Sequence, residues 1–309
     1  AQSDDPAAER DLGIVLREKG EVEEAIKVLQ RAVAIRPDYA EAHRNLGIAL
    51  QANDSLEQAL ASFSRAIALK PYYADAHMNL GAAFMVQGRT DDAIAAQNHA
   101  IRLKPNLAGA HNNLGLALLE DGKREEAEAS FRHALALQPG YSEALSNLGS
   151  VLIAQGRFDE AFAAHSEAVK AKPNSSAAHR HLGMALHETG RTEEAERELR
   201  EAITLAPRDA DAFNALGALL DATGRLDDAL DAHRTAVALR PNNRDAHFGF
   251  AATLLLHGRY KEGFAEYEWR TRMADFPSPR RQFDTPAWDG GNPAGRTILL
   301  HDEQGLGDS

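Results

Sequence analysis

Residues 74–107 read ADAHMNLGAAFMVQGRTDDAIAAQNHAIRLKPNL, and this stretch predicts two short amphipathic helices. Its apolar residues recur at helical spacing in two stripes, which are Ala76, Leu80, Ala83 and Phe84, and then Ala93, Ala96, Ala100 and Leu103. Gly88 should end the first helix, because glycine adopts the left-handed conformation without steric penalty. Pro105 should end the second, because the residue before a proline disfavours the helical region. The stretch therefore predicts a helix–turn–helix unit.

The same unit recurs along the chain with a period of 34 residues. Proline occupies one position of the period at Pro37, Pro71, Pro105, Pro139, Pro173, Pro207 and Pro241. A Leu-Gly pair recurs in phase from Leu12-Gly13 to Leu216-Gly217, and two alanine series run from Ala25 to Ala229 and from Ala32 to Ala236. Four series in one register indicate a repeat array, in which each unit buries its apolar face against its neighbours.

This pattern resembles the tetratricopeptide repeat family over residues 6 to about 275. The resemblance implies an all-α fold, a right-handed α-solenoid superhelix of helix–turn–helix units, with a short non-helical C-terminal tail. We expect a superhelical domain over residues 1–276 with eight units at 6–39, 40–73, 74–107, 108–141, 142–175, 176–209, 210–243 and a divergent 244–276. The last unit replaces the glycine and the two alanines by Ala251, Gly263 and Arg270, as a terminal cap or a junction does.

Small residues of the repeat should lie where its two helices cross. Gly81 and Ala93 are two such residues, and a larger side chain there would hold the backbones apart. Ala127 is the equivalent of Ala93 in the next unit, whereas we expect the adjacent Glu128 to lie on the surface.

Composition and charge exclude several classes of partner. The formal net charge is −12, and nucleic-acid binding needs a basic face that releases counterions from phosphates. An anionic membrane surface is disfavoured for the same reason, and no apolar run approaches the roughly 18 residues of a membrane span. The chain has no cysteine, which excludes disulfides and zinc–thiolate sites. We expect a cytoplasmic protein, but the chain opens AQSDDP without methionine, as a processed or excised piece does, and leaves a periplasmic location open.

The thirteen histidines suggest a metal site, but their spacing does not. Five of them occupy the fourth position of a unit, namely His43, His77, His111, His179 and His247. They are one repeat apart, and packed helix axes are about 8–10 Å apart, which is too far for one ion to bridge. His179 and His181 point to different faces of their helix. We therefore expect these histidines to fill a half-buried packing slot, and we expect neither a metal site nor a cofactor.

A row of asparagines is the strongest candidate for a binding site. It consists of Asn45, Asn79, Asn113 and Asn147, each two residues after the fourth position of its unit. The row closely resembles the asparagine ladder of the repeats of O-linked N-acetylglucosamine transferases, and the resemblance implies that it faces a concave groove. A side-chain amide has a donor and an acceptor, so it can pair with any peptide unit. The alternative is that these asparagines cap or bridge adjacent helices. The row is interrupted at His181, Ala215 and Gly249.

The resemblance also implies which other first-helix residues line the middle of this groove. They are Met78, Ala82, Met85, Leu116, Leu119, Ser150 and Ile153. Methionine and aliphatic side chains suit an adaptable binding surface, although burial between neighbouring first helices is the alternative for each of them. A lysine or arginine clamp for a C-terminal carboxylate is not evident. The second position of the units is acidic instead, at Glu41, Asp75, Glu143, Asp211 and Asp245, which favours a basic or neutral guest segment.

The last part of the chain, residues 277–309, differs in character from the repeats. Four prolines and Gly290-Gly291 break any helix, and Thr297–His301 reads as one buried strand before the loop Gly305–Asp308. The strings EGFAEYEWR, PAWDGG and GRTILLHDEQGLGD resemble the junction at which bacterial repeat proteins continue into a heptosyltransferase-like glycosyltransferase domain. In that resemblance Asp308 matches an acidic loop residue. One strand cannot bury itself, so we expect no catalytic domain within this chain and expect residues from 277 onward to be poorly ordered or docked on the last unit.

Two functions follow from these patterns. The first is a protein–protein interaction scaffold that binds an extended polypeptide along its concave groove, with no nucleic-acid or membrane partner. The alternative is the substrate-recognition arm of a glycosyltransferase whose catalytic domain is missing from this chain. A third, purely structural solenoid would leave the groove without a role, and self-association through the terminal units is left open.

Overall fold

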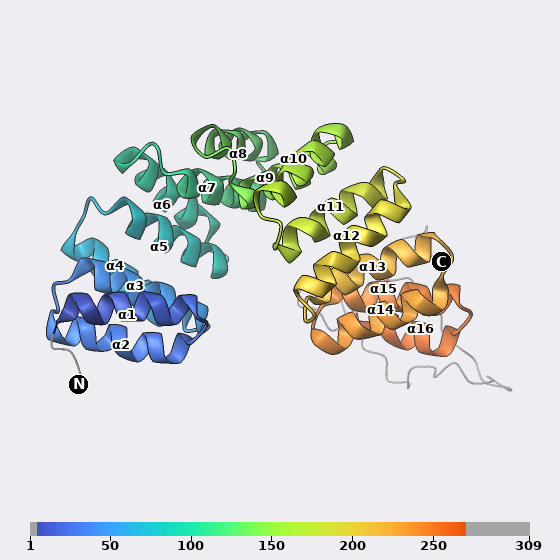
Figure 1. Cartoon of the computed structure of the whole chain (residues 1–309), viewed down its shortest axis with the longest axis horizontal. Helices are drawn as coiled ribbons and strands as arrows, with labels where there is room; N and C mark the ends of the chain where they lie inside the picture. Colours follow the sequence, from blue (N-terminus) through green and yellow to red (C-terminus); the bar gives the residue numbers. More distant parts are fainter. Residues whose placement is uncertain (1–4, 270–309) are drawn as a thin grey trace, which may run out of the picture. The chain divides into compact units, whose positions relative to one another are not determined.

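The computed structural model describes residues 5–269, all of whose regular structure is helical (Figure 1). The all-α repeat fold is therefore confirmed, and no strand occurs within this range. The helices are α1 (Pro6–Glu18), α2 (Val22–Ile35), α3 (Ala40–Ala52), α4 (Leu56–Leu69), α5 (Ala74–Val86), α6 (Thr90–Leu103), α7 (Ala108–Glu120), α8 (Arg124–Leu137), α9 (Ser142–Ala154), α10 (Phe158–Ala171), α11 (Ser176–Glu188), α12 (Thr192–Leu205), α13 (Ala210–Ala222), α14 (Leu226–Leu239), α15 (Arg244–Leu256) and α16 (Tyr260–Tyr267). Every odd-numbered helix begins at the first residue of a predicted repeat. The predicted tail, with the strand at 297–301 and Asp308, lies outside the described residues.

The chain divides into two compact units, Ala1–Ala171 and Lys172–Ser309. Within each one, the first helix of a repeat packs on the second helix of that repeat, and the second packs on the first helix of the next repeat. Consecutive first helices also contact one another, as α1, α3, α5, α7 and α9 do in the N-terminal compact unit. No two second helices are in contact within the part of the chain that the structure describes. A stack whose members meet on one side only curves toward that side, so the first helices form the inner face of each compact unit.

The glycine of each Leu-Gly pair makes room for one side chain of the second helix. A Cβ atom on Gly115 would lie 2.6 Å from Cε1 of Phe131, which is closer than real Cβ contacts. The same relation joins Gly13 to Leu29, Gly47 to Phe63, Gly81 to Gln97, Gly149 to His165, Gly183 to Leu199 and Gly217 to His233. The glycine is thus required by the close approach of the second helix, and the residue opposite it is fully enclosed.

The two alanine series form the rest of this crossing, as predicted. Ala93 and Ala127 have no exposed surface, and neither has any other member of either series. The prediction for Glu128 is wrong, because its side chain is only 15% exposed and accepts hydrogen bonds from Arg157 at 2.9 Å and Gln155 at 3.0 Å. Those partners belong to the next repeat, so the carboxylate lies between two repeats rather than in solvent.

The turns end the helices in the expected way. Gly88 has a φ of +72°, and its N–H donates to the Met85 carbonyl as the first helix ends. Asp54 takes the equivalent place in the second repeat with a φ of +54°, a conformation that an aspartate adopts more readily than most residues. The second helix ends at Leu103, and Lys104, immediately before Pro105, has left the helical region with a φ of −144° and a ψ of 86°, which confirms the predicted end of this helix.

Candidate functional site

The histidines at the fourth repeat position have a structural partner. In all five, Nε2 lies 2.8–3.0 Å from the carbonyl oxygen of the proline six residues earlier, as in His111 with Pro105 and His247 with Pro241. A carbonyl only accepts, so Nε2 carries the proton and donates. Three of these rings, those of His111, His179 and His247, are buried. The predicted packing role is confirmed, since each ring ties its first helix to the preceding turn.

The histidines do not assemble into a metal site in the described residues. The His77 ring lies tilted by 49° against that of His99, and the His111 ring stacks on that of His133, with ring centroids 4.3 and 4.2 Å apart. Within residues 5–269 there is no group of three or more histidine, cysteine, aspartate or glutamate side chains arranged to hold an ion.

Each member of the asparagine row lies on a first helix, one on each of α3, α5, α7 and α9. All four side chains are half-buried. The Asn45 side chain makes no hydrogen bond within the described residues, and the buried Nδ2 of Asn79 likewise has no partner. Asn147 differs, because its Nδ2 donates to Oδ1 of Asn112 on α7 at 2.9 Å. Asn147 therefore bridges two adjacent first helices, which was the alternative interpretation for the whole row.

Asn112 is a residue that sequence reasoning missed. It is buried, it accepts from Asn147, and its own Nδ2 lies 3.5 Å from Oδ1 of Asn113. These three amides form a chain across α9 and α7 that leaves Nδ2 of Asn113 as its terminal donor. The two consecutive asparagines in one first helix were the available signal.

The apolar neighbours of the row differ in accessibility. Leu116 is 39% exposed. Leu119 and Ile153 are partly buried and pack against a core that contains Phe131 and Leu152. Met78 lies against α7, since its sulfur would be 3.1 Å from a Cβ on Gly109, whereas Met85 is half-buried. We define the central face as the residues at these positions of the third to fifth repeats: Met78, Asn79, Ala82, Met85, Asn112, Asn113, Leu116, Leu119, Ser146, Asn147, Ser150 and Ile153.

The central face carries no charge, and acidic residues beside the inner face are partly neutralised. Glu41 pairs with Lys70 at 3.0 Å, and this hydrogen bond lowers the pKa of the Glu41 carboxyl. Asp211 likewise pairs with Arg240 at 3.0 Å and accepts from Asn243. Both carboxylates are therefore paired with a cation of their own repeat and attract a basic guest less strongly than the sequence suggested.

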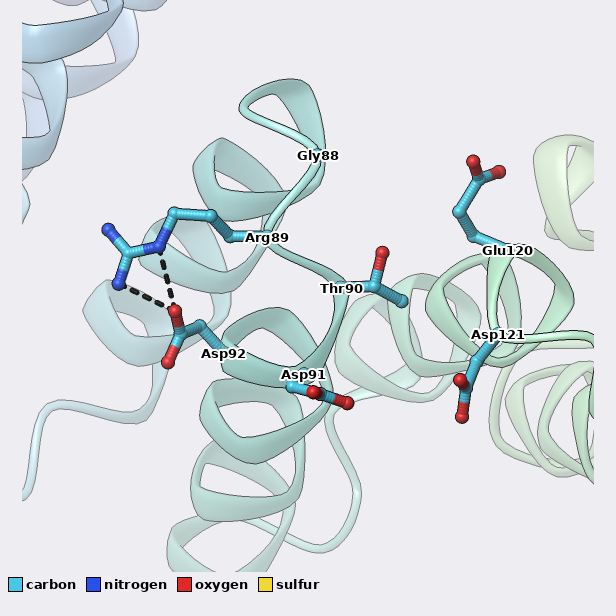
Figure 2. A pocket seen from close by; sticks show the side chains of 7 residues that line it. All are labelled: Gly88, Arg89, Thr90, Asp91, Asp92, Glu120 and Asp121. Atoms are coloured by element: carbon cyan, nitrogen blue, oxygen red, sulfur yellow. Dashed lines mark hydrogen bonds and ion pairs between the residues drawn. The ribbon is translucent and has the colours of Figure 1, made fainter. Parts of the chain in front are cut away.

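A shallow hollow lies at the turn between α5 and α6 and the end of α7, and Figure 2 shows its lining. Arg89 pairs with Asp92 at 2.6 Å across one side of it, and Asp121 pairs with Lys123 at 2.8 Å. Asp91 and Glu120 also border the hollow. These acidic side chains lie at the start of α6 and the end of α7, whereas the asparagine row lies in the first halves of α5 and α7. The hollow is therefore separate from the asparagine row.

A buried polar cluster in the C-terminal compact unit has the residue types of a catalytic site but not the arrangement. Nδ1 of His233 lies 3.0 Å from Oδ1 of Asn214, and Nε2 lies 3.2 Å from Oδ2 of Asp221. The Thr253 hydroxyl donates to the same carboxylate at 2.6 Å rather than to the imidazole, so His233 does not activate it as a nucleophile. Thr253 has no exposed surface and His233 is 1% exposed. The cluster therefore joins α13, α14 and α15.

His181 occupies the position of the asparagine row in the sixth repeat, and burial lowers its pKa to about 4. The nearby Arg180 lowers it further, whereas Asp209 opposes the shift. A histidine with a folded pKa below its unfolded value of 6.5 stabilises the fold above that value, and the stabilisation is lost as pH falls toward 4.

We expect the free energy of unfolding to fall by about 2 kcal/mol from pH 7 to pH 5 through His181 alone, because only the unfolded chain is protonated there. Urea titrations at both pH values measure it, with His181→Asn as the comparison, since asparagine occupies this position in four other repeats. An equal loss in the variant and in the wild type would show that His181 is not responsible.

Three family models match the chain. One described as "TPR repeat" covers residues 13–54, and two described as "Tetratricopeptide repeat" cover residues 44–108, 112–176 and 214–268, and residues 152–220. A comparison with curated proteins gives no match. No helix in the described part of the chain is long and apolar enough to cross a membrane.

Similar solved structures support the fold. The crystal structure of the APC/C hetero-tetramer Cut9–Hcn1 aligns with a TM-score of 0.69 and 21% identity over 78% of this chain, which spans only 48% of that one. TTC0263, a thermophilic TPR protein of Thermus thermophilus, aligns with a TM-score of 0.55 and 26% identity over 59% of this chain and 99% of its own. PilF of Pseudomonas aeruginosa aligns with a TM-score of 0.56 and 20% identity over 67% of this chain and 94% of its own. The likenesses to Cut9–Hcn1 and PilF bear on the fold alone.

Proposed function

Because the chain belongs to the tetratricopeptide repeat family, we propose that it is an interaction scaffold that binds an extended polypeptide along the first helices of its N-terminal compact unit. The observation that carries this proposal is the recurrence of half-buried asparagines on successive first helices, three of which make no hydrogen bond to a neighbouring helix. Asparagine is a poor residue for a helix interior, so its recurrence on one face needs a reason outside the helix.

The chemistry of the central face supports a guest whose backbone is accessible. A side-chain amide has a donor and an acceptor, which match one peptide group of any sequence. The Asn45 amide makes no hydrogen bond within residues 5–269, and Asn113, whose Oδ1 accepts from Asn112, keeps its Nδ2 as a donor. Exposed Leu116 and half-buried Met85 add apolar area without selecting a shape. A folded helix has no free peptide groups, so the guest is an unstructured or loop-like segment.

We expect alanine at Asn45, Asn79 and Asn113 together to weaken guest binding about a hundredfold, since each net hydrogen bond contributes ~0.5–1.5 kcal/mol. A single substitution should weaken it about tenfold or less. The measurement is a fluorescence titration of the full chain with a library of unstructured, uncharged peptides of about 12 residues, long enough to pass four repeats at the rise of an extended chain.

A matched triple variant controls for loss of asparagine as such. Asn98, Asn106 and Asn242 lie on α6 or in exposed turns, and their replacement by alanine should leave affinity unchanged. Equal affinity of the wild type and the first triple variant would reject the asparagine row as the binding site. Asn147→Ala should instead reduce stability, because it removes the bond to Asn112.

A second function, recognition of substrate for a glycosyltransferase, rests on the resemblance of residues 262–308 to a junction with such a domain. In this proposal the guest of the asparagine row is the acceptor protein, and Asp308 belongs to the first loop of the catalytic domain. The coding sequence after Ser309 tests it. A continuous α/β domain supports the proposal, and a stop codon or an unrelated domain rejects it.

A further inference from the structure

We propose that the guest of the central face is an uncharged segment in the polyproline II conformation, one turn of which spans one repeat. This inference rests on the proposed function and identifies the class of polypeptide that the same site selects. It follows from the spacing of the first helices, from the needs of the asparagine amides and from the absence of charge on the central face.

The spacing of the row is set by helices in direct contact. α3, α5, α7 and α9 each contact the next member of the series, and helix axes that pack together are about 8–10 Å apart. A polyproline II helix has three residues per turn and rises 3.1 Å per residue, so one turn advances about 9 Å. Each repeat would therefore meet the same face of the guest, displaced by three residues.

A β-strand does not match this spacing equally well. Its rise of about 3.3 Å per residue also brings a third residue to the next repeat, but its successive residues alternate between two faces. After three residues the strand presents its opposite edge, so Asn45 and Asn113 would meet one edge and Asn79 the other. The four asparagines share one position of the repeat and lie on the same side of their helices, which favours the threefold guest.

The hydrogen-bonding capacity of the row fits the same guest. A polyproline II backbone makes no internal hydrogen bonds, so its carbonyls are available at every residue. Nδ2 of Asn113, the terminal donor of the amide chain from Asn147 through Asn112, can donate to such a carbonyl even where the guest residue is proline and lacks an N–H. The half-buried side chains of Asn45 and Asn79 carry one further amide in each of the two preceding repeats. Nδ2 of Asn79 is buried without a partner in the described part of the chain, so it reaches a guest only when the Asn79 side chain turns outward.

The side chains around the row complete the match. None of the twelve residues of the central face is charged, so a charged guest side chain would lose water there without gaining a partner. The second repeat, where Asn45 lies, differs in carrying Arg44 at an equivalent position. Leu116, Met85 and Ile153 are accessible or half-buried apolar contacts for the rings and aliphatic groups of such a segment. The favoured guest therefore combines proline with small or amide side chains.

Three synthetic peptides test the inference, each with four copies of a triplet and no charge: Pro-Ala-Gln, Gly-Ala-Gln and Thr-Ala-Gln. They favour, respectively, polyproline II, a flexible coil and an extended strand. We expect the full chain to bind the proline peptide about tenfold more tightly than the glycine peptide, because less conformational freedom is lost on binding. Affinity should rise with each added triplet up to four and then level off.

The outcomes separate this inference from the proposed function. Tighter binding of the threonine peptide, or equal binding of all three with loss in the Asn45, Asn79 and Asn113 triple alanine variant, would overturn the polyproline II conformation and leave the asparagine row in place. Binding of the proline peptide that is unchanged in that variant would overturn both. A proline preference that disappears in the triple variant supports both.

Discussion

Replacing Ala127 by leucine will lower the free energy of unfolding by about 3 kcal/mol, the upper part of the range for overpacking a core. Ala127 has no exposed surface and lies at the crossing of α7 and α8, beside a core that includes Leu114 and Phe131. A leucine there adds three carbon atoms where no space exists, so either the two helices move apart or the leucine adopts a strained rotamer. Because each repeat is stabilised mainly by its neighbours, the loss should extend to the adjacent helices.

The control is the same substitution two residues later on the same helix. Ala129 is exposed, so Ala129→Leu changes helix propensity little and should shift stability by less than about 0.5 kcal/mol. Denaturation followed by circular dichroism, with the midpoint and the slope compared, measures both variants. Similar midpoints for Ala127→Leu and Ala129→Leu would place the crossing elsewhere. Glu128 is not a suitable control, because it pairs with Arg157 of the next repeat.

A methyl group on Gly115 will be almost as damaging, with an expected loss of about 2–3 kcal/mol. Its Cβ would lie 2.6–2.8 Å from three atoms of the Phe131 ring, and that ring is completely buried and has no free direction in which to move. The helix propensity of alanine exceeds that of glycine by about 1 kcal/mol, which offsets part of the clash but not all of it.

Two further variants isolate the cause. Gly140→Ala introduces a methyl group with nothing within 4 Å and should be neutral or slightly stabilising, because alanine restricts the unfolded chain. Phe131→Leu should reduce the penalty of Gly115→Ala in the double variant, since a smaller side chain can yield to the new methyl group. Independent, additive losses in the double variant would show that the methyl group does not contact position 131.

The sequence by itself was sufficient for the helical repeat. The spacing of Ala93, Ala100 and Leu103 on one helix face, and Gly88 and Pro105 at the helix ends, act within a few residues of each other, so local rules determine where each helix begins and stops. The packing role of His111 was also predictable. Histidines one repeat apart are too far from each other to bind the same metal ion, which leaves packing as their role. What it packs against, the Pro105 carbonyl, lies six residues away in the same chain segment.

Contacts between repeats were decided only by the tertiary structure. A period of 34 residues says which positions are equivalent but not which side chain of the next repeat lies opposite. Glu128 and Asn147 therefore have partners, Arg157 and Asn112, that no local pattern indicates. Within a single repeat the period is equally silent about Gln97, His165 and His233, which fill the space beside a glycine where other repeats use leucine or phenylalanine. Local physics fixes the helix pair, whereas long-range packing fixes which of its polar groups are occupied and which remain available to a guest.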